Sequence, residues 1–353
     1  MKKNNYQLID LAKLFFAICV IGIHTKFLSE YKIGYYINTN IYRIAVPFFF
    51  ICNGYFMAKS VNNTLDKKSK LFKLTKQYLF WCLLYTFLCN FFVVWDFSYT
   101  GLLNDIIKVF TFRSTNIMWY LGVLLIYTFI IYLVKDEKKL KILYLLSIVG
   151  YILGLSFVTY RYVFLGTKYE VIINLFDKLF TSNRYFPFTI MFPFMGYFLN
   201  RRKSLNKIST YKILILLIIS QILLLCETRM FYEKSLIFNE YDYFIFTPFV
   251  ALLLFGFLIK CNLKFKFDTT CLRNLSKSLF FNQFIFIYLF YLYDKINYSK
   301  INGADELVVW FRQSSFRMFI YVLTSTLVLS VIINKKTKVI KNMRWFLWII
   351  KRI

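Results

Sequence analysis

Residues 8–24 read LIDLAKLFFAICVIGIH, in which only Asp10, Lys13 and His24 are strongly polar. An apolar run of this length, extended by a few residues, is typical of a helix that crosses a lipid bilayer. Nine comparable runs follow it, and none shows the alternating pattern of a membrane β-barrel strand. The sequence therefore predicts an all-α polytopic membrane protein, a bundle of about ten transmembrane helices. The predicted spans are residues 8–28, 41–58, 78–95, 117–134, 140–159, 184–199, 211–226, 241–259, 278–293 and 315–334.

The overall composition supports this fold class. The chain has 353 residues, of which 59% are hydrophobic, and it carries a formal net charge of +28. A soluble protein this basic would usually bind nucleic acid, but a soluble protein this apolar could not bury its hydrophobic residues. A membrane protein with Lys and Arg in its loops accounts for both properties. We therefore expect the lipid bilayer as a partner and no nucleic acid.

The distribution of charge predicts the orientation of the chain. With the N-terminus placed in the cytoplasm, the cytoplasmic segments hold 29 basic and four acidic residues, a net charge of +25. The opposite side holds 15 basic and 12 acidic residues, a net charge of +3. Because basic residues concentrate in cytoplasmic loops, we expect both termini to be cytoplasmic.

The predicted domain organisation is simple. No long hydrophilic stretch separates the spans, so residues 1–334 are expected to form a single integral-membrane domain. Residues 335–353 combine Lys and Arg with Trp and Phe, which is typical of a basic cytoplasmic tail with a short interfacial helix.

Cysteine and histidine usage excludes several kinds of site. The chain has seven Cys without a CxxC pair and one His, so the sequence predicts no metal site. It also lacks a Gly-rich phosphate loop and a GxSxG nucleophile motif.

The polar residues of the first span lie on one face. Lys13 and His24 are eleven residues apart, a rotation of about 1100°, so both point the same way and are about 16 Å apart along the helix axis. Asp10 precedes Lys13 by one turn and can pair with it. One helix would then carry a cation near the cytoplasmic end and a potential base near the outer face. Two simpler interpretations remain: Lys13 extends to the inner headgroups, and His24 is a hydrogen-bonded residue of the bundle.

The next span begins with the second informative stretch, IYRIAVPFFFICNGYFM over residues 41–57. Basic-x10-His in the first span, followed by Arg43-x-x-Val46-Pro47 and a Gly54-Tyr55 pair, resembles the membrane acyltransferase 3 family. Further matching elements are Met118-Trp119-Tyr120-Leu121, Phe192-Pro193-Phe194-Met195-Gly196-Tyr197 and Leu275-Ser276 through Gln283. The sequence departs from the family pattern at Lys13, Asn53 and Gln283, where the family has Arg, Ser and His.

The resemblance implies an integral-membrane acyltransferase. Such an enzyme would move an acyl group, usually acetyl, from cytoplasmic acyl-CoA to a hydroxyl of a cell-surface polysaccharide or lipid-linked glycan, in the bacterial plasma (inner) membrane. In this interpretation His24 is the general base, Arg43 supports it, and Glu227 orients His24 or binds sugar hydroxyls. Lys13 and Asp10 would contribute to binding acyl-CoA, with Trp119 lining the acyl channel or stacking on a sugar. Contact of Arg43 with lipid phosphate, solvation of Glu227 and packing of Trp119 are the structural alternatives.

Two other functions remain open at this stage. One is a non-enzymatic transporter or flippase of a glycan or polar lipid. The other is a catalytically silent family member, which the departures from the family pattern suggest. The acceptor, the acyl chain and the oligomeric state cannot be derived from the sequence.

Overall fold

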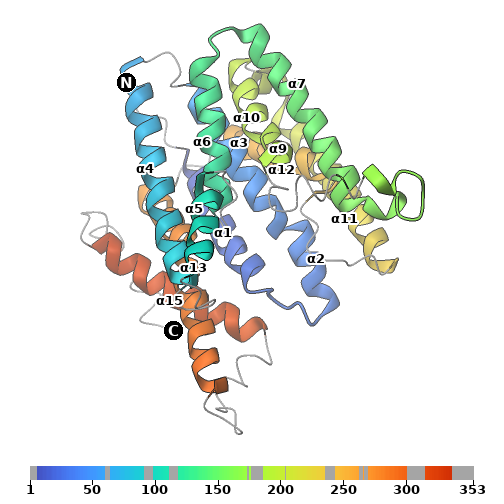
Figure 1. The fold of residues 1–353 in the computed structure, drawn as a ribbon. Helices are drawn as coiled ribbons and strands as arrows, with labels where there is room; N and C mark the ends of the chain where they lie inside the picture. Colours follow the sequence, from blue (N-terminus) through green and yellow to red (C-terminus); the bar gives the residue numbers. More distant parts are fainter. Residues whose placement is uncertain are drawn as a thin grey trace. The chain divides into compact units, whose positions relative to one another are not determined.

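The fold is helical in a computed structural model whose described residues contain no strand (Figure 1). These residues are 6–59, 64–90, 98–110, 118–172, 175, 186–202, 204–234, 243–261, 265, 269–299 and 315–335. The α-helices are α1 Gln7–His24, α2 Lys32–Asn40, α3 Ala45–Ala58, α4 Thr64–Cys89, α5 Tyr99–Phe110, α6 Met118–Leu133, α7 Glu137–Gly154, α9 Phe186–Thr189, α10 Met191–Arg201, α11 Thr210–Glu233, α12 Thr247–Lys260, α13 Thr270–Ser299 and α15 Ser315–Lys335. Short helical turns are η1 Tyr42–Ile44, η3 Leu155–Thr159, η4 Arg161–Val163 and η5 Ser204–Lys207.

Six helical stretches in the described residues are long and apolar enough to cross a membrane. They are Gln7–His24, Lys32–Ala58, Glu137–Thr159, Thr210–Glu233, Thr270–Tyr293 and Ser315–Asn334. Two further apolar helices, Met118–Leu133 and Thr247–Lys260, are shorter. The described residues thus confirm an all-helical fold with several helices that have the length and apolar composition of membrane spans. The count of about ten spans and the cytoplasmic location of both termini stay predictions.

The surface of several helices is as apolar as a lipid environment requires. Only 22% of the apolar window of α7 and 28% of that of α11 is buried, against 61% for α13. The exposed faces of α7 and α11 carry aliphatic side chains such as Leu145, Leu146, Ile218 and Ile222. Water would not tolerate such an exposed aliphatic surface, whereas a hydrocarbon layer matches it. Most of the apolar window of α13 is therefore covered by other residues, whereas most of that of α7 and of α11 is not.

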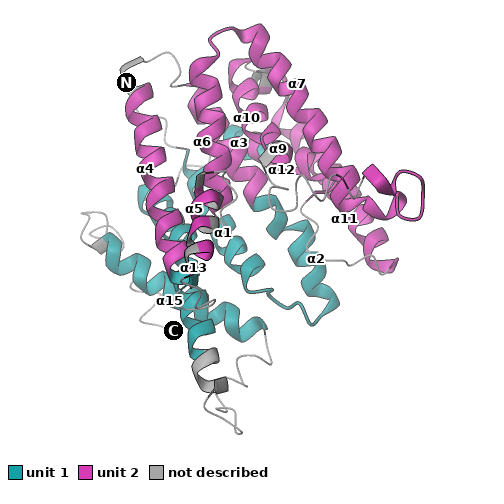
Figure 2. Ribbon diagram, in the orientation of Figure 1, with its two compact units in different colours: residues 1–45, 88–95, 257–353 teal, residues 46–87, 96–256 magenta. Residues whose placement is uncertain are grey.

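The chain forms two compact units, shown in different colours in Figure 2. Unit 1 comprises residues 1–45, 88–95 and 257–353, and unit 2 comprises residues 46–87 and 96–256. The single domain expected over residues 1–334 stays a prediction. The expected tail helix in residues 335–353 lies, apart from Lys335, outside the described residues.

Unit 1 is built around α1 and α13, which pack against each other along their length. Arg273 contacts Asp10, and one turn later Ser276 contacts Lys13, both pairs being 263 residues apart. A constant offset means that the two helices run in the same direction.

Unit 2 contains a close crossing of α3 and α10. A Cβ added at Gly54 would collide with the backbone of Pro193, and one added at Gly196 would collide with the backbone of Ile51. Small residues at such crossings let helix backbones approach closely in membranes. On the same helix, the amide of Asn53 donates hydrogen bonds to the Tyr120 hydroxyl (2.6 Å) and to its own helix backbone. The amide of Asn53 thus links α3 to α6.

Two helices have no counterpart among the predicted spans. α2 is nine residues long and includes polar residues such as Asn38 and Asn40, so its hydropathy is too low to stand out. α5 has twelve residues, and Ile106 and Ile107 are exposed on it. Each helix by itself is shorter than the roughly 20 residues of a spanning helix, so the apolar pattern does not reveal it. In the structure α2 forms, with η1 and α3, the longer stretch Lys32–Ala58.

Candidate functional site

The stripe predicted on the first span lies on one unbroken helix. α1 runs from Gln7 to His24 without interruption, so the helical geometry places Lys13 and His24 on one side and about 16 Å apart along the axis. Both side chains are partly exposed, whereas Asp10 is buried. The helix thus has one polar residue accessible near each end.

His24 is the last residue of α1 and packs against α13. Its imidazole ring meets the ring of Phe284 edge-on, with 4.7 Å between the ring centroids. The hydroxyl of the next residue, Thr25, donates to the carbonyl oxygen of Ile21 at 2.9 Å and helps to end the helix. The imidazole is therefore held at a defined position, and the residue as a whole is partly exposed.

Arg43 lies close to His24 because η1 packs directly on α1. A Cβ at Gly22 would collide with the ring of Tyr42, so the glycine allows this turn to approach the helix backbone. Arg43 follows Tyr42, is buried, and is near enough for its charge to act on the imidazole. The structure thus brings together two of the residues expected in the catalytic site.

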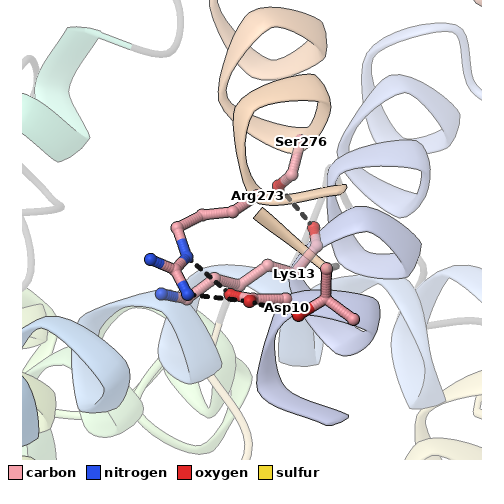
Figure 3. A network of polar contacts seen from close by, with 5 residues as sticks. Asp10, Lys13, Arg273 and Ser276 are labelled. Atoms are coloured by element: carbon pink, nitrogen blue, oxygen red, sulfur yellow. Dashed lines mark hydrogen bonds and ion pairs between the residues drawn. The ribbon is translucent and has the colours of Figure 1, made fainter. Parts of the chain in front are cut away.

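At the other end of α1, Asp10 forms an ion pair that the sequence did not predict. Its carboxylate accepts hydrogen bonds from Arg273 Nε (2.7 Å) and Nη2 (2.8 Å), and from the hydroxyl of Thr269 (2.9 Å) (Figure 3). The side chain of Asp10 is 3% exposed and that of Arg273 is 45% exposed. The carboxylate is therefore committed to protein partners, whereas nearly half of the Arg273 side chain is accessible.

Lys13 lies beside this ion pair (Figure 3). Its backbone carbonyl accepts a hydrogen bond from the hydroxyl of Ser276 at 2.7 Å, which ties α1 to α13 one turn beyond Asp10. Arg273 was missed at the sequence level because its partner is 263 residues away. The one available signal was its position two residues before the Leu275-Ser276 element.

Glu227 has partners within unit 2. Its carboxylate accepts hydrogen bonds from the Tyr160 hydroxyl (2.5 Å) and from the backbone N–H groups of Ile245 (2.8 Å) and Phe246 (3.3 Å). Burial, and next the bond to Glu227, raise the pKa of Tyr160, so this phenol stays a donor at neutral pH. These contacts hold the segment before α12 against α11. The expected roles of Glu227, orienting His24 or binding sugar, stay predictions.

Trp119 also belongs to unit 2. Its ring lies near that of Phe50, with 6.1 Å between centroids, and the side chain is partly exposed. Packing against α3 accounts for its position. Contact with an acyl chain or a sugar stays a prediction.

Comparison with known proteins identifies the chain's family. Residues 6–335 match the acyltransferase 3 family, described as "Acyltransferase domain". The chain belongs to this family. The resemblance to the acyltransferase 3 family, which rests on the first two spans, is confirmed. The match includes residues of both compact units of this acyltransferase-family protein.

Curated relatives of this acyltransferase-family chain carry another name. It is 29% identical over 283 residues to an amino-acid racemase of Enterococcus faecalis, covering 75% of this chain and 39% of that protein. A second amino-acid racemase of the same organism is 28% identical over 227 residues, covering 61% of this chain and 32% of the relative. The chain thus spans about two fifths or less of the length of these relatives. No solved structure matches it.

Proposed function

We propose that this protein is an integral-membrane acyltransferase that moves an acyl group, preferably acetyl, from cytoplasmic acyl-CoA to a hydroxyl. The acceptor class that we favour is a cell-surface polysaccharide or a lipid-linked glycan, and the location is the bacterial plasma membrane. Membership of the acyltransferase 3 family supports the reaction type. The names of the racemases are not transferred, because most of each relative lies outside the matched part.

The observation that carries this proposal is the arrangement of unit 1 around α1. Near one end of the helix, partly exposed His24 lies within the influence of Arg43. Near the other end, Lys13 lies beside Arg273 and Asp10 (Figure 3). A base at one end and cations at the other suit a donor whose phosphates and reactive thioester are separated by a long arm.

The reaction assigns a role to each of these residues. His24 accepts the proton of the acceptor hydroxyl while the hydroxyl oxygen forms a bond to the carbonyl carbon of the thioester. The electron pair of the C=O π bond moves to the carbonyl oxygen. Arg43 stabilises the negative charge on that oxygen. When the carbonyl re-forms, the carbon–sulfur bond breaks, and the CoA sulfur leaves with the proton held by His24. Acyl group, proton and electron pairs are then balanced, with no other reactant.

The direct test measures CoA thiol release by the full chain in lipid nanodiscs. Acetyl-CoA is supplied with a panel of lipid-linked sugars, polysaccharide fragments and amino acids as acceptors. We expect acceptor-dependent thiol release, and we expect His24→Gln to lower it by at least 10²-fold, the scale of general-base catalysis. Lys26→Gln, which removes an exposed cation two residues beyond His24, is the control and should retain activity.

The remaining outcomes separate the alternatives. Movement of a glycan or polar lipid across the nanodisc or vesicle without thiol release, and without sensitivity to His24→Gln, would indicate a transporter. Failure to bind acetyl-CoA at all would indicate a silent family member. Full turnover by His24→Gln would show that another group is the base.

A further inference from the structure

The ion pair between Asp10 and Arg273 has a consequence for ligand binding. We propose that Arg273 is a second phosphate-binding cation beside Lys13, and that Asp10 is the positioning residue that orients its guanidinium. The ligand class is a phosphate-bearing molecule, and the occupant that we favour is the phosphorylated end of the acyl-CoA donor. This inference rests on the proposed function and extends it to Arg273, which the sequence did not single out.

The geometry of the pair fixes the guanidinium plane. Arg273 donates from Nε and Nη2 to the two carboxylate oxygens of Asp10, at 2.7 and 2.8 Å. The hydroxyl of Thr269 donates to Oδ2 of the same carboxylate at 2.9 Å. A bidentate pair of this kind restricts the rotation of the guanidinium far more than a single hydrogen bond would. The guanidinium is therefore preorganised before a ligand arrives.

Exposure differs sharply between the two partners. The side chain of Asp10 is 3% exposed, so a ligand cannot reach its carboxylate. The side chain of Arg273 is 45% exposed, so nearly half of it is accessible from outside the packed pair. An incoming anion would therefore meet the cation and not the carboxylate. A phosphate-binding role for Arg273 requires this accessible part of the side chain.

The charges of the cluster favour an anion. Asp10, Lys13, Thr269, Arg273 and Ser276 together carry two basic side chains and one carboxylate, a formal charge of +1. Arg273 offers a planar fork and Lys13 a mobile point charge, two complementary modes of phosphate binding.

The position of the cluster fits the donor. Ser276 donates to the backbone carbonyl of Lys13 at 2.7 Å, which sets the register of α1 and α13 and keeps Arg273 next to Lys13. His24 lies about 16 Å farther along α1. A phosphate bound by Arg273 and Lys13 would thus be separated from the base by several helical turns, which the pantetheine arm of CoA can cover.

The test compares ligand affinity in variants that keep the helix pair intact. Arg273→Gln alone would leave the buried Asp10 carboxylate without its ion-pair partner, which strongly destabilises a fold. The double variant Asp10→Asn/Arg273→Gln replaces the pair by two neutral amides, and Arg273→Lys keeps the charge without the fork. The probes are acetyl-CoA and adenosine 3′,5′-bisphosphate, titrated against the full chain in phosphatidylcholine nanodiscs. Lys141→Gln, which removes an exposed cation of α7, controls for net charge.

We expect the double variant to bind both probes at least tenfold more weakly than the wild type, the scale of a lost charge-assisted hydrogen bond. Arg273→Lys should weaken binding several-fold, and Lys141→Gln should leave it unchanged. Asp10→Asn tests the positioning role. It removes a negative charge, so simple electrostatics predicts tighter binding, whereas loss of the bidentate geometry predicts weaker binding. Tighter binding would overturn the role given to Asp10.

Two further results separate this inference from its alternatives. If Arg273 binds lipid phosphate instead, anionic phosphatidylglycerol in the nanodisc should stabilise the wild type more than the double variant. The wild type and the double variant should then bind acetyl-CoA with equal affinity. That result would overturn the choice of the donor as occupant. Acyl transfer with unchanged donor affinity in all Arg273 variants would refute this inference and leave the proposed function standing. Binding of adenosine 3′,5′-bisphosphate through Arg273 without any acyl transfer would support this inference and refute the proposed function.

Discussion

The imidazole of His24 lies edge-on against the ring of Phe284, with 4.7 Å between their centroids, so α13 fixes the side chain that would act as the base. Phe284 is buried, and its own ring also lies near Tyr288. The proposed catalytic residue is therefore supported by a helix that is distant in sequence. This support can be tested separately from the chemistry of the imidazole.

Phe284→Leu should lower kcat several-fold with little change in the KM for acetyl-CoA, because the base loses its aromatic neighbour while the distant donor contacts remain. The loss of ring packing should cost about 0.5–1.5 kcal/mol of stability. Phe290→Leu is the matched control, since Phe290 is a buried phenylalanine six residues farther along α13. Equal kinetic effects of the two substitutions would mean that the contact with His24 has no special role.

Gly22→Ala should move η1 away from α1, because the added Cβ would collide with the ring of Tyr42. We expect a lower thermal unfolding midpoint, a loss of about 1–3 kcal/mol by overpacking, and reduced acyl transfer because Arg43 follows Tyr42. Gly256→Ala is a milder comparison, since its Cβ would meet the end of the flexible Leu205 side chain at 3.0 Å. An unchanged midpoint and activity in Gly22→Ala would contradict the close packing of η1 on α1.

Glu227→Gln should destabilise the protein by about 1–3 kcal/mol. The substitution removes the carboxylate charge that accepts hydrogen bonds from the Tyr160 hydroxyl and from two backbone N–H groups. Thermal unfolding in detergent measures this effect. Glu233→Gln, which removes one partner of the exposed Arg229–Glu233 pair, should change stability by less than about 1 kcal/mol. A stable Glu227→Gln protein with abolished turnover would instead support the catalytic role that the sequence suggested.

Glu30 should make the protein more sensitive to acid. Burial alone would raise the pKa of Glu30, but hydrogen bonds from the Ser315 hydroxyl and backbone N–H outweigh it and lower the pKa below the ordinary value of 4.5. A carboxyl group with a depressed folded-state pKa contributes stability above 4.5, and this contribution is lost as the pH falls through the folded-state value. Unfolding midpoints measured between pH 7 and pH 3 should therefore fall less steeply for Glu30→Gln than for the wild type. Parallel curves for the two proteins would show that the link from Glu30 to the start of α15 is too weak to matter.

The predicted spans and the observed helices agree where the apolar pattern is strong. The first span is a helix over Gln7–His24, and the last is a helix over Ser315–Lys335. Hydropathy also identifies α7 and α11, because each contains a long run of apolar residues that is visible in the sequence without knowledge of its neighbours. It does not identify α2, whose polar residues lower the average. A single-residue scale cannot separate a short polar helix from a loop.

The candidate site was predictable in part. Lys13 and His24 share a face because the eleven-residue spacing is a property of any α-helix, so local geometry suffices. The proximity of Arg43 to His24 followed from the family pattern and is explained by Gly22. The sequence marks Asp10 as a charged residue within the first span, but it does not reveal that Arg273 is its partner. Glu227 was noted as polar, but its bonds to Tyr160 and to the segment before α12 were not foreseen.

The class of protein, the family and the polar stripe of the first helix can all be derived from the amino-acid sequence. Each of these depends on composition or on spacings within about twenty residues, over which helix geometry is fixed by the backbone. Which charges meet depends instead on how distant helices pack. Asp10 and Arg273 are 263 residues apart, and Tyr160 and Glu227 are 67 apart, so no local periodicity relates them. Their pairing arises from the register in which helices pack, and that register depends on many side chains at once.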